Sequence, residues 1–316
     1  MFLHPQGRRR SILGALLIIA TSAPAFSQVS TETSAANEVA LPLTEIIVTA
    51  QRRQTALQDT PIAVSAVTGE AIQEQRLINL ADIAARVPSI TFDQVNPSES
   101  FISIRGTTIG NDAAGIDQGV SVFIDDVPTT GFGDNSPDLY DLASVEVLRG
   151  PQGTLFGRNV TGGAVLVNTL QPSFTSAGRA TLTYGSNNLM EAQGYLTGPV
   201  AQDQLAGKIA FDIRRRDNWL PNVTLRDNTG GEDLGSVRGQ LLWTPSESLR
   251  ITVGADHLND TSASKVQYLE GNFQPSLFPM LVYGPSATNQ GSNSFADKKV
   301  DGLLAKIEWT LAFATL

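Results

Sequence analysis

Residues 146–163 read EVLRGPQGTLFGRNVTGG, and five of these eighteen residues are glycine. Glycine-rich loops often hold phosphate, which raises two phosphate-binding patterns. A Walker loop needs four residues between its glycines and a lysine after the second. Here three residues separate Gly153 from Gly157, and Arg158 follows. A dinucleotide loop needs Gly-x-Gly, but Gly150 and Gly153 are one residue too far apart, and a strand pattern rather than a helix follows. The glycines are therefore interpreted as positions for tight turns and close packing.

Around this motif, residues 60–172 combine one helix signal with several strand signals. Asn79 and Asp82 have the spacing of a capping box, and the apolar residues that follow share one helix face up to Pro88. Strands are predicted at 62–67, 101–104, 120–124, 145–148 and 164–168, each bounded by turn residues. This pattern predicts a small α+β domain.

After residue 172, long segments alternate between apolar and polar residues. The apolar sets are Ala180/Leu182/Tyr184, Met190/Ala192/Gly194/Leu196, Leu205/Gly207/Ile209/Phe211/Ile213, Val237/Gly239/Leu241/Trp243, Leu249/Ile251/Val253/Ala255 and Leu303/Ala305/Ile307/Trp309/Leu311. Strands of about nine to eleven residues suit a tilted crossing of a bilayer. Short connections (198–204, 245–248) and long ones (217–233, 260–298) also fit an outer-membrane barrel. The alternation alone also fits a soluble β-sandwich.

The amino terminus has the order of a secretory signal peptide. Three arginines at 8–10 precede an apolar run from Ile12 to Ala20 and then small residues. Cleavage is predicted after Ser27, with Ala25 as the alternative, so residues 1–27 form the signal peptide. The sequence holds no run of about twenty apolar residues, so a membrane-embedded form would have to use strands.

Composition excludes several functions. Without residues 1–27 the chain has 19 basic and 31 acidic residues, a net charge of −12 that disfavours a nucleic-acid partner. There is no cysteine, and His257 is the one histidine left. A histidine-rich metal site is therefore excluded, and a Ser-His-Asp triad would depend on that residue. We expect neither an enzyme nor a bound cofactor.

Four motifs follow one another along the chain: residues 45–53, residues 104–106, residues 122–128 and the run from Ser144 to Val165. Together they resemble the TonB-dependent outer-membrane receptors. The run from Ser144 to Val165 resembles the signature of their plug domain, as do Ile104-Arg105-Gly106 and residues 122–128, VFIDDVP. Residues 45–53, EIIVTAQRR, resemble the TonB box that precedes the plug and are called the box segment below. The resemblance implies a flexible lead with the box at 28–59, a plug at 60–172 and barrel strands at 173–316.

The resemblance also implies a function. Such receptors take up a scarce ligand, such as a ferric siderophore, across the outer membrane, with energy delivered by TonB. The expected TonB-binding residues are Glu45, Ile46, Ile47, Val48, Thr49 and Ala50. An apolar β-prone hexamer of this kind suits pairing with a partner as an added strand. It could instead be an ordinary first strand.

Further residues carry expectations from the same resemblance. Arg105 and Arg149 match plug arginines that pair with barrel glutamates, with solvated turn positions as the alternative. Ligand contacts are expected in the plug loops, at Asn111, Asp112, Asp117, Phe132 and Asn135. Asp125 and Asp126 are adjacent in a strand-like stretch and would face opposite sides, so a turn is predicted rather than acid–base chemistry.

The expected fold class is an α+β plug followed by antiparallel transmembrane strands, about six of the 22 in a full barrel. An open sheet in lipid leaves backbone groups unpaired at its edges. Six strands should therefore not span a membrane alone. The resemblance nevertheless predicts a transport receptor, with TonB, outer-membrane lipid and a small ligand as partners. The alternative is a truncated or split receptor that keeps plug and box but cannot transport alone.

Overall fold

The computed structural model describes residues 46–50, 52, 55–96, 99–107, 119–129, 139–201, 203–263, 288, 297–311 and 314–315. The predicted signal peptide, Glu45 and the five expected ligand contacts lie outside these residues. Within the described residues, no helix is both long and apolar enough to cross a membrane. The domain boundaries expected from the sequence stay predictions.

The first part of the described chain is an α+β domain. Its elements are β1 (Ile47–Val48), β2 (Thr55–Ala56), the 3-10 turn η1 (Leu57–Asp59), β3 (Val64–Thr68), α1 (Gly69–Glu74), α2 (Leu80–Ala84), β4 (Ile90–Asn96), β5 (Glu99–Ile104), β6 (Val120–Ile124), β7 (Val127–Pro128), β8 (Leu142–Arg149), α3 (Gly153–Phe156) and β9 (Gly163–Thr169). Five of the strands form one sheet in the order β3-β8-β9-β6-β7, in which β6 and β9 run parallel and the other pairs antiparallel.

Local signals explain much of this domain. The predicted capping box is present, since Asn79 accepts from the Asp82 amide and Asp82 accepts from the Asn79 amide. The predicted turn at Asp125-Asp126 is confirmed as the two-residue loop of the β6–β7 hairpin, with φ of 46° and 70°. Both values lie in the left-handed region, where Asp is tolerated better than most residues. The short helix α3 inside the glycine motif was not predicted.

The central strands β8 and β9 are buried on both faces, which is the pattern of a sheet covered on two sides. One face packs against α1 and α2 through an apolar cluster that includes Val145, Val147, Val165 and Val167. The residues between them point to the other face, because side chains alternate along a strand. There Leu148 and Leu166 belong to a second cluster, which the box segment completes.

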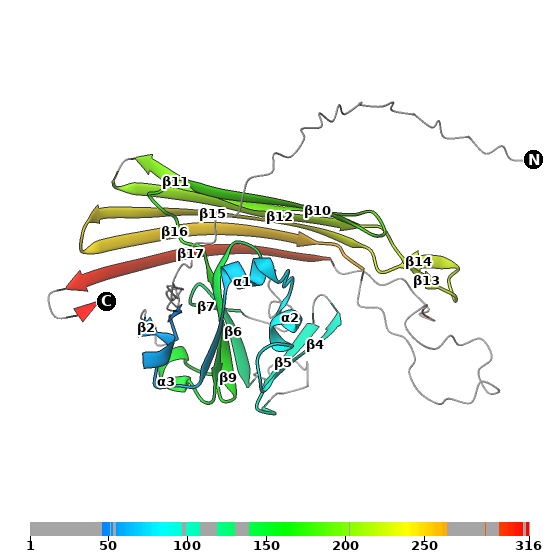
Figure 1. The fold of residues 1–316 in the computed structure, drawn as a ribbon, viewed down its shortest axis with the longest axis horizontal. Helices are drawn as coiled ribbons and strands as arrows, with labels where there is room; N and C mark the ends of the chain where they lie inside the picture. The colour runs from blue at the N-terminus through cyan, green and yellow to red at the C-terminus, as the bar shows by residue number, and fades with distance from the viewer. Residues whose placement is uncertain are drawn as a thin grey trace, which may run out of the picture. The chain divides into compact units, whose positions relative to one another are not determined.

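The second part is a seven-stranded antiparallel sheet. Its strands are β10 (Ala177–Gly185), β11 (Leu189–Ala201), β12 (Leu205–Arg216), β15 (Glu232–Ser246), β16 (Leu249–Asp260), β17 (Lys298–Leu311) and β18 (Ala314–Thr315), paired in that order. Figure 1 shows the six long strands side by side. A small hairpin, β13 (Leu220–Asn222) with β14 (Asp227–Thr229), occupies the long connection between β12 and β15. The sheet is open, as predicted for a partial barrel.

The predicted alternation sets the two faces of this sheet. The apolar sets named from the sequence lie on one face, where many large side chains are exposed, among them Leu182, Leu196, Ile209, Leu241, Leu303 and Ile307. The opposite face carries buried polar residues, including Lys208, Asp212, Gln240 and Thr252. This apolar-out, polar-in arrangement is that of a membrane-spanning β-sheet rather than of a water-soluble sandwich.

Candidate functional site

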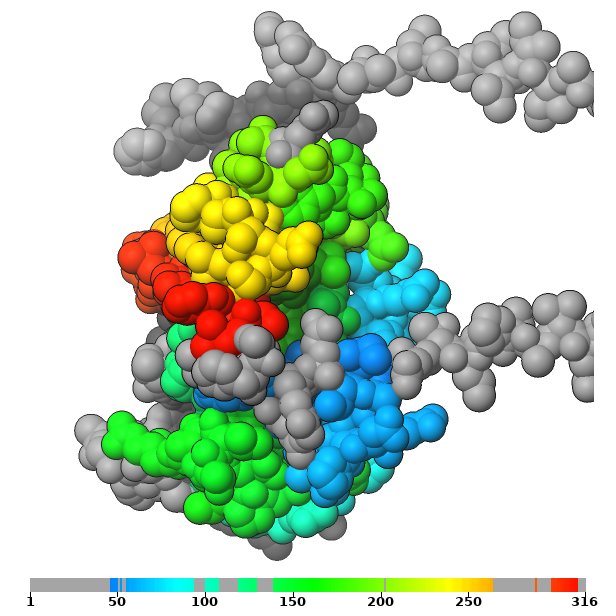
Figure 2. Space-filling view, turned by 90° about the vertical axis from the view of Figure 1, so that its left-hand side faces the viewer, coloured from blue at the N-terminus to red at the C-terminus, as the bar shows by residue number. Residues whose placement is uncertain are grey.

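The box segment is docked on the α+β domain. Ile47 and Val48 pair with Ala56 and Thr55, and the Leu57 amide donates to the Ile46 carbonyl at 2.9 Å. The Val48 and Ala50 side chains are fully buried at 0% exposure, whereas Ile47 is 46% exposed. Figure 2 shows the start of the described chain, in blue, against the green part of the domain. The segment is thus a strand whose alternate side chains face the core and the outside.

A buried carboxylate of the glycine motif binds the box segment. Glu146 lies on β8 and accepts from the Thr49 amide with both oxygens, at 2.8 and 3.0 Å. The Thr49 hydroxyl also donates to it at 3.0 Å, and the Asn168 amide group at 2.8 Å. Burial raises the pKa of Glu146 above its ordinary value, and the hydrogen bonds from Thr49, Ser144 and Asn168 oppose that rise.

Other residues of the glycine motif also pack against the box segment. Helix α3 places Phe156 against Phe123, with ring centroids 5.1 Å apart. The Arg52 guanidinium lies over the Phe156 ring, 5.3 Å from its centroid, a cation–π contact. The Gln152 amide donates to the Val160 carbonyl at 3.0 Å and closes the loop. These contacts confirm turn and packing roles for the motif.

Gly163 is the motif position where a side chain is least tolerable. Its φ is +152°, and an added Cβ would lie 2.2 Å from the Leu148 carbonyl oxygen. Backbone strain costs about 1–3 kcal/mol and overpacking a similar amount. We expect Gly163→Ala to lower the free energy of unfolding by at least about 2 kcal/mol, measured by urea titration.

Gly153→Ala is the matched control for that prediction. Gly153 has no neighbouring atom within 4 Å of an added Cβ and begins α3, where alanine is favoured over glycine. Its unfolding midpoint should match the wild type or exceed it. Equal losses in both variants would contradict the assignment of close packing to Gly163.

Of the two arginines expected to contact the barrel, Arg105 reaches Gly150, the residue that follows Arg149. Arg105 has φ of 54° and is exposed, and a Cβ on Gly150 would lie 3.5 Å from its Nη1. The Arg149 Nε is buried and has no hydrogen-bond partner among the described residues. Neither forms an ion pair with the described strands, so their pairing with barrel glutamates stays a prediction.

Contacts between domain and sheet use acidic residues that the sequence reasoning did not assign to this role. Asp125 accepts from the Gln240 side chain of β15 at 3.2 Å and, within the domain, from the Thr169 amide at 2.8 Å. Asp126 pairs with Lys306 at 2.9 Å. The domain therefore contributes acids and the sheet contributes a base and an amide. An Asp-Asp turn was visible in the sequence, but its partners were not.

A fully buried ion pair joins Asp141 of the domain to Lys208 of the sheet. Their side chains are both 0% exposed and their charged atoms are 2.5 Å apart. Lys208 also donates to the Leu170 carbonyl, so its charge contacts two oxygens. Burial raises the pKa of Asp141 above its ordinary value, and the Lys208 ammonium opposes that rise. Next to this pair, the Arg238 guanidinium lies 5.1 Å from the Tyr140 ring centroid.

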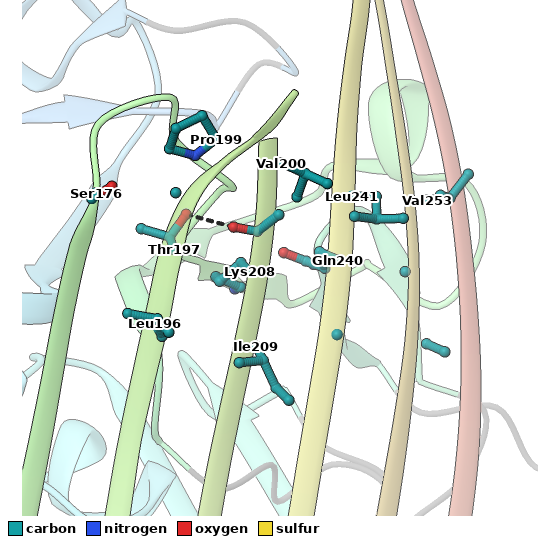
Figure 3. Close-up of a pocket in the computed structure, with 15 residues that line it drawn as sticks. Ser176, Leu196, Thr197, Pro199, Val200, Lys208, Ile209, Gln240, Leu241 and Val253 are labelled. Atoms are coloured by element: carbon teal, nitrogen blue, oxygen red, sulfur yellow. Dashed lines mark hydrogen bonds between the residues drawn. The ribbon is translucent and has the colours of Figure 1, made fainter. Parts of the chain in front are cut away.

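Hollows of different character adjoin the sheet. A cavity of about 280 Å³ lies between domain and sheet, with Asp125, Tyr140, Arg238 and Gln240 in its lining. A shallow groove of about 800 Å³ runs over the strands, as shown in Figure 3, where Leu196, Ile209, Leu241 and Val253 line it from neighbouring strands. Apolar side chains dominate the lining of the groove, whereas the lining of the cavity includes charged side chains. Within the described residues no cluster of His, Asp or Glu could hold a metal ion.

Comparisons with known proteins agree with this arrangement. Residues 56–164 match the family model of the TonB-dependent Receptor Plug Domain. Residues 56–164 therefore form a plug domain of this family. The plug motif from Ser144 to Val165 and the barrel-like strands after it follow the order that the resemblance implied.

Named relatives resemble this chain over part of its length. The Ferrioxamine B receptor of Salmonella typhimurium is 27% identical over 225 residues, 69% of this chain and 30% of its own length. The Pesticin receptor of Yersinia enterocolitica is 32% identical over 136 residues, 43% of this chain and 19% of its own. The pyoverdine outer membrane receptor FpvA from Pseudomonas aeruginosa shares the fold at 19% identity. Its TM-score is 0.65, with 84% of this chain and 38% of that chain covered.

The matched part of the chain thus spans well under half of the length of these relatives. Because the match to FpvA covers 84% of this chain, it includes both the α+β domain and the open sheet. The sheet is accordingly part of a barrel.

Proposed function

We propose that the protein takes part in TonB-energised uptake of a scarce small ligand, such as a ferric siderophore, across the outer membrane. The observation that carries this proposal is the docked box segment. A short β-prone strand with an exposed edge residue, Ile47, packs on a plug that is itself tied to membrane-type strands. That arrangement suits a strand-pairing partner on one side and a ligand on the other.

The outward face of the sheet supports a location in the membrane. On β15 the outward residues run from Trp243 to Asp233, ten positions apart. At about 3.4 Å per residue and a tilt of about 40°, this distance corresponds to roughly 25 Å, the height of an outer-membrane apolar band. Trp243 and Trp309 lie at the short-turn end, and the pairs Arg215–Asp233 and His257–Asp301 lie at the other. Aromatic and charged residues flank such bands in barrels.

The names of the relatives indicate which class of ligand this protein takes up. Their names specify ferrioxamine B, pesticin and pyoverdine, and a further relative from Escherichia coli is named a catecholate siderophore receptor. A siderophore-type iron chelate is therefore the first ligand to test. The candidate contacts Asn111, Asp112, Asp117, Phe132 and Asn135 stay predictions.

The test is uptake of radiolabelled iron, supplied as hydroxamate and catecholate chelates, in cells with and without the protein. Ile47→Pro removes the backbone N–H that strand pairing uses, so we expect uptake to fall at least tenfold and capture of TonB to be lost. Ile47→Val is the matched control and should transport normally. Normal uptake by Ile47→Pro at wild-type abundance would contradict the role of the box.

The alternative function is a truncated or split receptor. It predicts that the chain captures TonB through the box but gives no uptake unless further strands are supplied. Uptake by this chain alone would rule that alternative out.

A further inference from the structure

Glu146 is an unusual residue for its position. It lies between Val145 and Val147 in the middle of β8, and its side chain is fully buried. Alternation turns it to the face of the sheet that the box segment covers. A buried carboxylate is costly unless hydrogen bonds compensate it. Most of that compensation comes from a single residue of the box segment, Thr49.

The buried carboxylate of Glu146 and the docked box segment therefore stabilise each other. If the box segment leaves, Glu146 loses the amide and the hydroxyl of Thr49. Asn168 at 2.8 Å and Ser144 at 3.4 Å then remain as donors. Removing one side of a buried charged contact is strongly unfavourable, because the charge left behind is not compensated. The carboxylate therefore opposes undocking in addition to the burial of Val48 and Ala50.

The same contact competes with strand pairing. An added strand binds through backbone N–H and C=O groups. The Thr49 N–H is one of those groups in the box, and it donates to Glu146 in this structure. Neighbouring groups of Ile47 and Val48 are held by β2. A partner strand must replace both sets of bonds.

We propose that Glu146 is a positioning residue that keeps the box segment docked and so restricts its capture by a strand-pairing partner. The partner is TonB only if the proposed function holds. Arg52 over Phe156 and the buried Val48 hold the same segment by contacts without a charged acceptor. Glu146 adds the directional contact, which is lost within a short displacement.

The chain contains no cysteine, so a single introduced thiol reports one position. In the full chain, Val48→Cys places that thiol at a fully buried position of the box segment. We expect Glu146→Gln to raise the rate of maleimide labelling at this thiol at least tenfold. The glutamine amide has one acceptor in place of two and presents an N–H₂ group to the donors of Thr49 and Asn168.

Two controls separate docking from general stability. Glu74→Gln changes an exposed glutamate of α1 and should leave the labelling rate of the Val48→Cys chain unchanged. Val122→Cys reports the first core cluster, where Glu146→Gln should change labelling less than twofold. Parallel increases for the Val48→Cys and Val122→Cys thiols would overturn the proposal, because Glu146 would then act on the whole domain. An unchanged rate for the Val48→Cys thiol with both Glu146→Gln and Glu146→Ala would also overturn it.

Capture by the purified periplasmic domain of TonB distinguishes this inference from the proposed function. Several-fold greater capture of the Glu146→Gln chain than of the wild type would support both the positioning role of Glu146 and TonB as the partner. Faster labelling of the Val48→Cys thiol without capture of either chain would support the positioning role and contradict TonB as the partner.

Discussion

Lys208→Met is expected to destabilise the plug by about 3–5 kcal/mol, the largest effect of any single substitution considered for this protein. Lys208 and Asp141 are both fully buried, and the methionine retains the bulk of the lysine stem. The variant leaves the Asp141 carboxylate buried, and the cation that remains beside it in the described part of the chain is Arg238, whose Nη1 is 3.8 Å away. A loss of this size is a large fraction of the stability of a typical domain. The loss is measured by urea titration, with protease cleavage within the plug as the readout of unfolding.

Two further variants test the cause. The double variant Asp141→Leu with Lys208→Met removes both charges and should recover most of the loss, because an apolar pair can replace a buried ion pair at little cost. Lys306→Met is the matched control. Its partner Asp126 is 37% exposed and Lys306 is 42% exposed, so solvent screening limits the expected loss to about 1 kcal/mol or less. Equal losses for Lys208→Met and Lys306→Met would show that burial does not control this contact.

The local parts of the fold could be predicted from the sequence because their signals are local. The capping box needs only Asn79 and Asp82, three residues apart. The two faces of the large sheet follow from alternation, which places every second residue on the same side. The Asp125-Asp126 turn likewise depends on two adjacent residues. Each of these signals lies within one element or one turn.

The contacts that join elements could not be read in the same way. Glu146 binds Thr49 across 97 residues, and Lys208 binds Asp141 across 67. Nothing in the sequence around Lys208 distinguishes it from other inward-facing polar residues of its strand. Within the glycine motif, Arg149 was the charged residue expected to have a role. The buried acid of the same motif, Glu146, lies between two valines in a pattern that indicates only a strand. Burial of a charge becomes visible only when the partner from a distant segment is placed.

The outward face of the sheet gives the second large prediction. Val253→Arg places a guanidinium near the middle of the apolar stretch of β16, which runs from Leu249 to His257. Val253 is four positions from each of these ends, about 10 Å along the membrane normal for a strand tilted by about 40°. An arginine on the lipid face at this depth costs about 2–4 kcal/mol. Urea unfolding from phospholipid vesicles should show that loss.

The control lies on the same strand and face but at the charged edge of the band. His257 pairs with Asp301 at 2.7 Å and is 52% exposed. His257→Arg places a cation beside that carboxylate and lies where an arginine costs only about 0–1 kcal/mol. The difference between the two variants therefore measures depth rather than charge, because both end as arginine on one strand. If the face were in water instead, Val253→Arg would cost no more than His257→Arg. That outcome would contradict the membrane assignment of the sheet.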